Sequence, residues 1–107
     1  MKKIFKTTVF TLLLLSVAAY VQAQDVMVDG KKLFSQVVPA CSICHTLSHA
    51  GSAGEVGPSL DELKPDAARV AKALRNGIGQ MPAFKTLTDA EVTLLSNYVA
   101  AATGAGK

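Results

Sequence analysis

The sequence predicts a small all-α domain with long loops, and three observations lead to this prediction. Apolar residues recur at helical spacing over residues 67–74. Residues 88–91, Thr-Asp-Ala-Glu, have the form of a capping box, which marks the start of a helix. No segment shows the apolar/polar alternation that is typical of half-buried strands. We therefore expect three main helices joined by loops.

The first 23 residues have the zones of a secretory signal peptide in the right order. Three lysines within the first six residues form a positive region, and an apolar run follows from Val9 to Ala19. Small residues then precede a cleavage site after Ala23. The run is shorter than the about 20 apolar residues that span a bilayer. We expect residues 1–23 to be removed and residues 24–107 to form one domain, with a retained N-terminal anchor as the alternative.

The charge of the chain changes when this leader is set aside. The whole sequence has 11 basic and 8 acidic residues, and the three leader lysines account for the entire excess. Residues 24–107 therefore carry no formal net charge, so we expect no binding to nucleic acid. We also expect no stable membrane insertion after cleavage.

The first half of the mature chain predicts one helix and a long loop. Asp29 is placed to cap a helix over Gly30–Val37, and Gln24–Val28 before it form a loose lead-in. Residues 49–58 are rich in Gly, Ser and Ala, which predicts a surface loop. Residues 59–64 predict a brief helical turn.

The second half predicts two longer helices around an irregular segment. One helix opens at Pro65 and Asp66, with proline in its first turn, and stops at Gly77. The helical pattern is then interrupted over residues 78–87. The last helix follows the capping box, runs to about Thr103 and ends before Gly104.

The apolar core of such a domain would be marginal without an additional component. The chain has no Trp and only two cysteines, Cys41 and Cys44, which are too close in sequence for a disulfide to constrain much of the chain. These cysteines belong to the run Cys41-Ser42-Ile43-Cys44-His45, which has the C-x-x-C-H spacing of a c-type haem attachment site. Two thiols so spaced reach the two vinyl groups of one porphyrin, and His45 then binds the iron as proximal ligand. We expect one covalent haem c with its iron, which also completes the core.

Three other interpretations of the cysteines fit less well. A thioredoxin-like redox pair requires a βαβ setting, which this sequence lacks. A zinc site built from Cys41, Cys44, His45 and His49 would require adjacent residues to bind one ion together. A plain disulfide would leave His45 unexplained.

Met81 is the expected second axial ligand of the iron. It lies between Gly77 and Pro82, in the interrupted segment between two helices, and a thioether on haem iron favours the reduced state. Met27 lies in the predicted lead-in, and His49 is too close to His45 to reach the opposite side of the haem. Two alternatives remain open. Met81 is a core filler, or the iron has an open or water-bound position, as in a sensor or a peroxidase-like protein.

At this point the chain resembles the class I c-type cytochromes, over nearly all of the mature sequence. Three segments carry the resemblance: Gly30–Phe34, the loop Gly57-Pro58-Ser59-Leu60, and Met81-Pro82. It implies a small cytochrome c fold, with three main helices and loops wrapped around one haem. The Pro58 carbonyl would then accept a hydrogen bond from the ring N–H of His45.

The resemblance also implies contacts elsewhere, and the departures from it are informative. Gly30 and Phe34 would meet Tyr98 where the first and last helices cross, and Phe84 would shield the haem edge. The chain lacks the long mid-domain insert of mitochondrial cytochromes and the Trp that usually contacts a propionate. The stretch from Val56 to Phe84 looks like the small cytochromes that accept electrons from bacterial sulfite dehydrogenases.

The predicted function is that of a periplasmic electron carrier rather than an enzyme. Its expected partners are redox proteins: a periplasmic dehydrogenase as donor, and an oxidase or another cytochrome as acceptor. Lysines are expected to ring the haem edge, and the candidates are Lys31, Lys32, Lys64, Lys72 and Lys85. The alternatives are a haem c subunit held permanently in a periplasmic oxidoreductase complex, and a haem-based sensor if Met81 is not a ligand.

Overall fold

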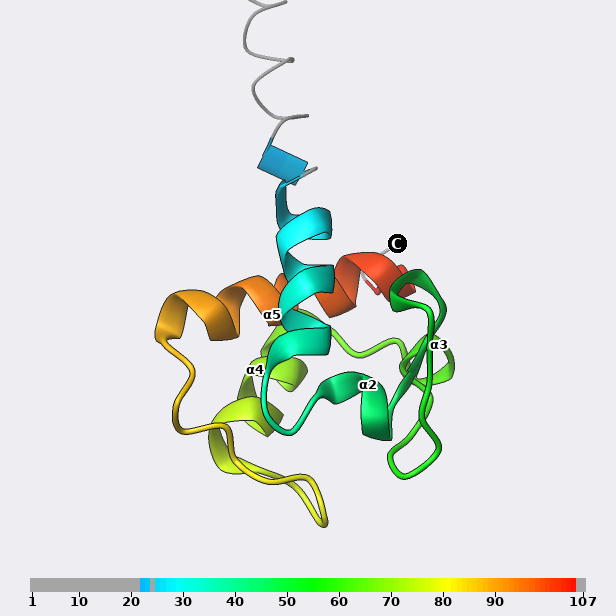
Figure 1. Cartoon of the computed structure of the whole chain (residues 1–107). Coiled ribbons are helices and arrows are strands. Elements are labelled where there is room, and N and C mark those ends of the chain that lie inside the picture. Colours follow the sequence, from blue (N-terminus) through cyan, green and yellow to red (C-terminus); the bar gives the residue numbers. More distant parts are fainter. Residues whose placement is uncertain (1–21, 24, 106–107) are drawn as a thin grey trace, which may run out of the picture.

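The helix formed by residues 25–36 crosses the last helix steeply, and this crossing joins the two ends of the described chain (Figure 1). The computed structural model describes residues 22, 23 and 25–105, so the predicted signal peptide lies almost entirely outside the described residues. The remaining elements are, in chain order, α2 (Cys41–Cys44), β1 (Thr46–Leu47), the 3-10 helix η1 (Ser48–Ala50), β2 (Ser52–Ala53), α3 (Leu60–Leu63), α4 (Ala67–Asn76) and α5 (Asp89–Thr103).

The helix crossing is formed by the three residues that the family resemblance implied. A Cβ added at Gly30 would lie 2.5 Å from Cγ of Tyr98, so only a glycine allows this approach. The rings of Phe34 and Tyr98 pack edge to face with their centroids 6.0 Å apart. Both aromatic side chains are essentially inaccessible to solvent. The expected crossing point is confirmed.

The first helix begins earlier than the sequence indicated. Residues 25–28 are helical rather than a loose lead-in, and Asp29 lies exposed within the helix instead of capping it. Val26 and Met27 are partly buried against the core, and this burial stabilises the additional turn. The prediction of a helix start at Gly30 was therefore wrong by about one turn.

The segment after the cysteines contains a small hairpin that the sequence did not reveal. β1 and β2 pair antiparallel, with Thr46 opposite Ala53 and Leu47 opposite Ser52. η1 and Gly51, which has a φ of 66°, form the connection between them. Strands of two residues are too short to show an alternating pattern, so the absence of alternation was not informative here. The domain is otherwise helical, as predicted.

α3 and α4 begin with side-chain caps. The Ser59 hydroxyl accepts a hydrogen bond from the backbone N–H of Glu62, which confirms the brief helical turn. The Asp66 carboxylate accepts one from the backbone N–H of Arg69 at 2.7 Å. Asp66 is thus the cap itself, and Pro65 precedes α4 instead of lying in its first turn. Gly77, with a φ of 70°, ends the helix as expected.

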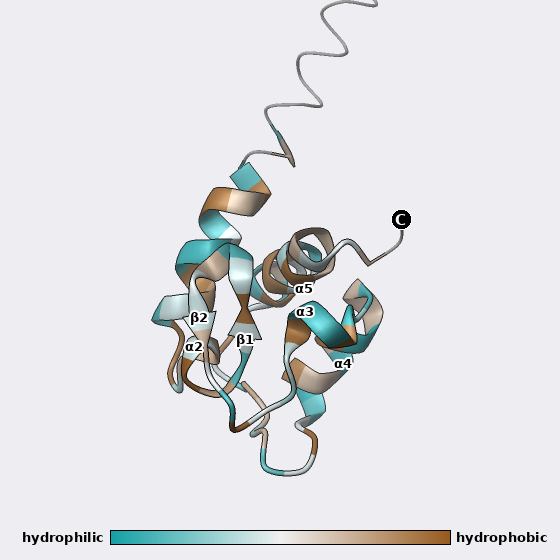
Figure 2. Ribbon diagram, turned by 90° about the vertical axis from the view of Figure 1, so that its right-hand side faces the viewer, coloured by the Kyte–Doolittle hydropathy of each residue, from teal (hydrophilic) through white to brown (hydrophobic). Residues whose placement is uncertain are grey.

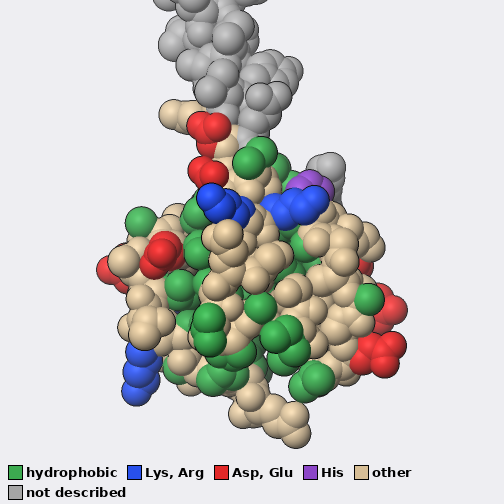
Figure 3. All heavy atoms as spheres, viewed as in Figure 1, with side chains coloured by type: hydrophobic (Ala, Val, Ile, Leu, Met, Phe, Trp, Pro, Cys, Tyr) green, Lys and Arg blue, Asp and Glu red, His purple; other side chains and the backbone are tan. Residues whose placement is uncertain are grey.

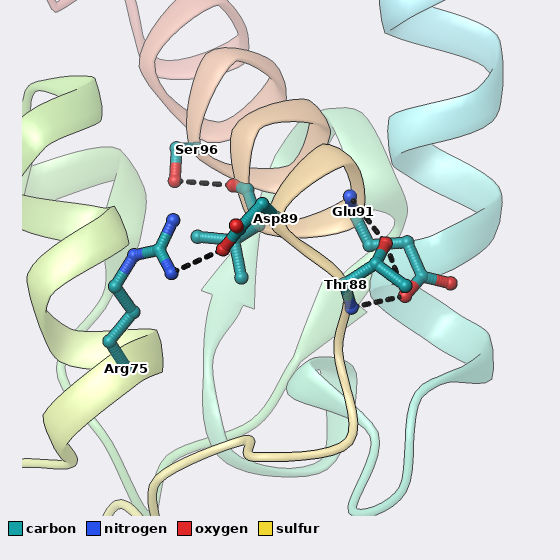
Figure 4. A network of polar contacts seen from close by, with 6 residues as sticks. Arg75, Thr88, Asp89, Glu91 and Ser96 are labelled. Atoms are coloured by element: carbon teal, nitrogen blue, oxygen red, sulfur yellow. Dashed lines mark hydrogen bonds and ion pairs between the residues drawn. The ribbon is translucent and has the colours of Figure 1, made fainter.

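α5 has the predicted capping box and packs along α4 (Figure 4). The Glu91 backbone N–H donates to the Thr88 hydroxyl at 3.2 Å, and the Thr88 backbone N–H donates to the Glu91 carboxylate at 2.8 Å. Gly104 adopts a left-handed conformation and ends the helix. Arg75, at the end of α4, forms an ion pair of 2.6 Å with Asp89, at the start of α5.

The core lies between these helices and the segment of α2 and the hairpin. Figure 2 places α2, β1 and β2 on one side of the molecule and α3 and α4 on the other. The buried apolar residues are Phe34, Val37, Leu47, Leu60, Leu74, Phe84, Val92, Leu95, Tyr98 and Val99. Within the described ranges, no helix has the length and apolar character needed to cross a membrane.

Candidate functional site

The two cysteines are presented by the single turn of α2. The His45 backbone N–H closes this turn by donating to the Cys41 carbonyl at 2.9 Å. Both thiols are half-buried, and they are not joined by a disulfide. The turn places Cys41, Cys44 and His45 within one small region of the molecule, as the C-x-x-C-H spacing predicts.

The His45 ring is fixed by the segment around Pro58. His45 Nδ1 lies 2.8 Å from the Pro58 carbonyl oxygen, and a carbonyl can only accept, so Nδ1–H is the donor. This bond leaves Nε2 with its lone pair available to a metal. A Cβ at Gly57 would lie 2.5 Å from Cε1 of the ring, so this close contact requires glycine. The hydrogen bond expected between His45 and Pro58 is present.

The backbone of the same loop packs directly on the cysteine turn. The Gly57 N–H donates to the Cys44 carbonyl at 2.7 Å. A Cβ at Gly54 would approach the Ile43 carbonyl oxygen to 2.6 Å and the His45 nitrogen to 2.7 Å. Sequence reasoning did not single out Gly54, because a glycine in a Gly/Ser/Ala-rich loop has no distinguishing signal. The structure makes it part of the support of His45.

A cavity of about 650 Å³ brings all five predicted site residues together. Cys41, Cys44, His45, Pro58 and Met81 line it, although Met81 is far from the others in sequence. Most of the other lining residues are apolar, and they come from the helix of residues 25–36, from α3, α4 and α5, and from the loops between these elements. Its volume lies in the usual range for cofactor sites of about 300–1,000 Å³. Two thiols, an imidazole and a thioether around an apolar cavity are a donor set that suits a haem.

Met81 reaches the cavity from a tight turn. Ile78 and Met81 exchange two backbone hydrogen bonds, of 3.0 and 2.9 Å. Gly79, with a φ of 55°, occupies the first central position of the turn, where this conformation favours glycine. The Gly/Pro character of residues 77–82 therefore has a direct structural cause.

The rival ligands lie away from the cavity. His49 Nδ1 is hydrogen-bonded to the Tyr98 hydroxyl at 2.9 Å, and neither His49 nor Met27 lines the cavity. Phe84, which was expected to shield the haem edge, is buried and lines the cavity. Of the five lysines expected to ring this edge, only Lys72 lines the cavity. In the view of Figure 3, Lys and Arg side chains stand apart from one another and do not form a ring.

The cysteine environment does not suit dithiol redox chemistry or zinc binding. Burial is the largest cause that raises the pKa of the Cys41 thiol, to about 11, whereas reactive redox cysteines have a lowered pKa. Among residues 22, 23 and 25–105, no three His, Cys, Asp or Glu side chains are grouped so that they could hold a metal ion.

Comparisons with known proteins found one family and a solved structure that are similar to this chain. The family described as "Cytochrome C oxidase, cbb3-type, subunit III" matches residues 25–99. The crystal structure of the c-type cytochrome SorU from Sinorhizobium meliloti is similar, with 49% sequence identity and a TM-score of 0.72. The similarity covers 76% of this chain and 94% of that chain. Among curated proteins, none matches the sequence.

Proposed function

Since this chain belongs to the c-type cytochromes, which transfer electrons through covalently bound haem c, we propose that it is an exported carrier with a His45- and Met81-ligated iron. Membership of this family makes it an electron-transfer protein rather than an enzyme, and redox proteins are its partners. We further propose that residues 1–23 are a signal peptide and that the mature protein works in the periplasm.

The observation that carries the proposed ligation is the shared cavity. Cys41, Cys44 and His45 enter it from the turn of α2, and Met81 enters it from the turn between α4 and α5. The two cysteines would hold the haem through thioethers, and the group would supply a one-electron Fe(III)/Fe(II) couple. Every other contribution comes from the chain, which excludes water and orients the two axial side chains.

His45 is prepared for its role as an axial ligand. The Pro58 carbonyl holds the ring N–H at Nδ1, so the ring cannot rotate without losing a hydrogen bond. A hydrogen bond at the second ring nitrogen also strengthens a histidine as a metal ligand. Gly57 lies against the ring and keeps the loop close enough for the bond to form.

A six-coordinate iron leaves no position for a substrate, so the proposed function is outer-sphere electron transfer. Three exposed apolar residues, Val56, Leu63 and Ile78, line the cavity and provide a surface that a redox partner can contact briefly. We propose a periplasmic dehydrogenase as donor. A sulfite dehydrogenase is the first candidate, because the stretch from Val56 to Phe84 resembles the cytochromes that such enzymes reduce.

Methionine ligation is tested by replacing Met81 with an isosteric residue that has no sulfur. In Met81→Leu we expect the haem to remain attached, the weak sulfur-to-iron band of the ferric protein to disappear, and the reduction potential to fall. Met27→Leu is the matched control, since Met27 packs on the core and does not line the cavity. An unchanged spectrum in Met81→Leu would exclude Met81 as a ligand and favour the sensor alternative.

The carrier role and its donor are tested on the mature holoprotein. Stopped-flow mixing of the ferric protein with a sulfite dehydrogenase and sulfite should give reduction that is first order in each protein. Gel filtration of a periplasmic extract separates the two electron-transfer roles. A carrier elutes at the size of the single chain, whereas elution with a larger enzyme would identify a permanent subunit.

A further inference from the structure

Among the described residues, the only Lys, Arg, Asp or Glu side chains on the carrier's cavity wall are two cations on α4. Arg69 and Lys72 both line the cavity, and no carboxylate of the described residues does. They are three positions apart on one helix, so their side chains leave the same side of α4. Both are exposed, which places the cations where the cavity meets solvent.

The described chain does not use either cation. The ion pair formed among these residues joins Arg75 to Asp89, and it involves neither Arg69 nor Lys72. Asp66, the acidic residue nearest to Arg69 in sequence, caps α4 by accepting from the Arg69 backbone N–H at 2.7 Å. That carboxylate is directed at the backbone of the helix. The guanidinium and the ammonium therefore keep their donors for another group.

A haem brings two carboxylates into this cavity as its propionates. A carboxylate that leaves water without a charged or hydrogen-bonded partner is strongly destabilised. The family's usual tryptophan contact is missing, because the chain has no Trp. Asn76 and Gln80 also line the cavity, but these neutral amides cannot offset a negative charge.

We propose that Arg69 and Lys72 bind the haem propionates and hold that edge of the haem at the solvent-facing side of α4. Arginine suits this role because its planar guanidinium can pair with a carboxylate through two parallel hydrogen bonds. The inference rests on the proposed seating of the haem in the cavity, and it does not depend on Met81 as a ligand.

The pairing has a direct effect on the redox couple. Two uncompensated carboxylates near the iron would stabilise the ferric state, and nearby cations offset that effect. Neutralising the cations should therefore lower the reduction potential. It should also raise the pH at which the propionates ionise, because a carboxyl group that lacks a cationic neighbour holds its proton more tightly.

The experiment compares Arg69→Gln, Lys72→Gln and the double variant with Lys32→Gln, in the mature holoprotein. Lys32 is exposed on the helix of residues 25–36 and does not line the cavity, so it controls for the loss of one charge. Redox titrations from pH 4 to 9 give the potential, and haem-methyl NMR shifts of the ferric protein follow propionate ionisation. In the double variant we expect the ferrous/ferric ratio at a given potential to fall threefold to tenfold, which means a reduction potential lower by about 30 to 59 mV. We also expect its propionates to ionise at higher pH. Arg69→Lys keeps the positive charge, so it should retain most of the original potential.

Two results would overturn the proposal. One is a double variant whose potential and ionisation match those of Lys32→Gln. The other is an unchanged potential with slower reduction by the donor, which would assign both cations to partner docking. Haem attachment in each variant is read from its absorbance, so a failure of the proposed haem site is seen separately from a failure of this inference.

Discussion

The two axial ligands that we propose, His45 and Met81, are held by the protein in very different ways. His45 is surrounded by contacts. Its ring bonds to the Pro58 carbonyl, and its own carbonyl accepts from the Ser52 hydroxyl at 3.0 Å. Gly54 and Gly57 press their backbones against the same turn. Met81 lies in a turn closed by two backbone hydrogen bonds, and its neighbours Gln80 and Pro82 are exposed.

The difference shows which of the two proposed ligands the chain positions by its own contacts. On the histidine side, the loop of residues 54–58 determines the position of the ligand atom. On the methionine side, an unbranched side chain with three rotatable bonds is only partly buried against the core, so the chain holds the sulfur less closely. We therefore expect perturbations of the histidine side to cost more, and the following predictions test that order.

Gly57→Ala should have the largest effect. The new Cβ would lie 2.5 Å from Cε1 of His45, so the ring or the loop must move. Overpacking of this kind costs about 1–3 kcal/mol, and loss of the bond to Pro58 adds about 1 kcal/mol. We expect a lower yield of holoprotein and a changed haem spectrum, measured by absorbance and thermal unfolding.

Gly79→Ala is the matched control on the methionine side. Nothing lies within 4 Å of a Cβ at this position, so only the positive φ of 55° opposes the substitution. The expected cost is about 1 kcal/mol, with the haem spectrum preserved. If Gly79→Ala proves as damaging as Gly57→Ala, the proposed order of the two sides is wrong.

High pH should lower the stability of the whole fold, because it ionises Tyr98 at the helix crossing. Burial raises the pKa of Tyr98 from an ordinary value of 10.0 to about 12. In the unfolded chain the phenol ionises near pH 10, whereas the folded protein keeps the proton until about pH 12. The free energy of unfolding should therefore be unaffected by this group below pH 10 and fall between pH 10 and 12.

The Tyr98 effect is isolated with Tyr98→Phe, which has no group to ionise. Guanidinium unfolding at pH 9, 10, 11 and 12 gives the slope for each protein. The variant should lack the part of the decline that is due to Tyr98. Equal slopes would mean that ionisation of the phenol does not contribute.

Much of the helical architecture and of the candidate site could be predicted because its signals are local. The capping box, the stop at Gly77 and the C-x-x-C-H turn each depend on a few neighbouring residues. The extra turn at residues 25–28 and the pairing of β1 with β2 depend on tertiary contacts, which leave no periodic pattern. Gly54 was missed for the same reason, because its partner is the backbone of Ile43 and His45.

Thr88→Ala should lower the stability moderately. It removes the hydroxyl that caps α5 at the point where the segment of residues 77–88, which carries Met81, enters this helix. Loss of an N-cap costs about 1 kcal/mol, measured as a lower melting temperature of the holoprotein. Thr93→Ala is the control, because Thr93 is exposed in the middle of α5 and alanine favours helices. A larger loss in Thr93→Ala would contradict the role given to the cap.

Arg75→Gln should have the smallest effect. The Arg75–Asp89 pair joins the end of α4 to the start of α5 (Figure 4). It therefore connects the two ends of the segment of residues 77–88, which carries Met81. The two side chains are 50% and 87% exposed, so water screens the pair and it contributes at most about 1 kcal/mol. Thermal unfolding at low salt should show a small difference that disappears near 1 M salt. A difference that persists at 1 M salt would mean that the pair is not the cause.

The contact between Gly30 and Tyr98 also has a topological consequence. It joins the two ends of the described chain, so the segments that line the cavity lie almost entirely within a stretch of chain with anchored ends. The entropy of closing a flexible loop grows only logarithmically, by about 0.6 kcal/mol for each doubling of its length. An insertion at the exposed Gly51, just after the 3-10 helix whose His49 bonds to Tyr98, would therefore cost little as long as the crossing forms. The architecture can accept insertions that reshape its outer surface while the metal centre keeps its geometry.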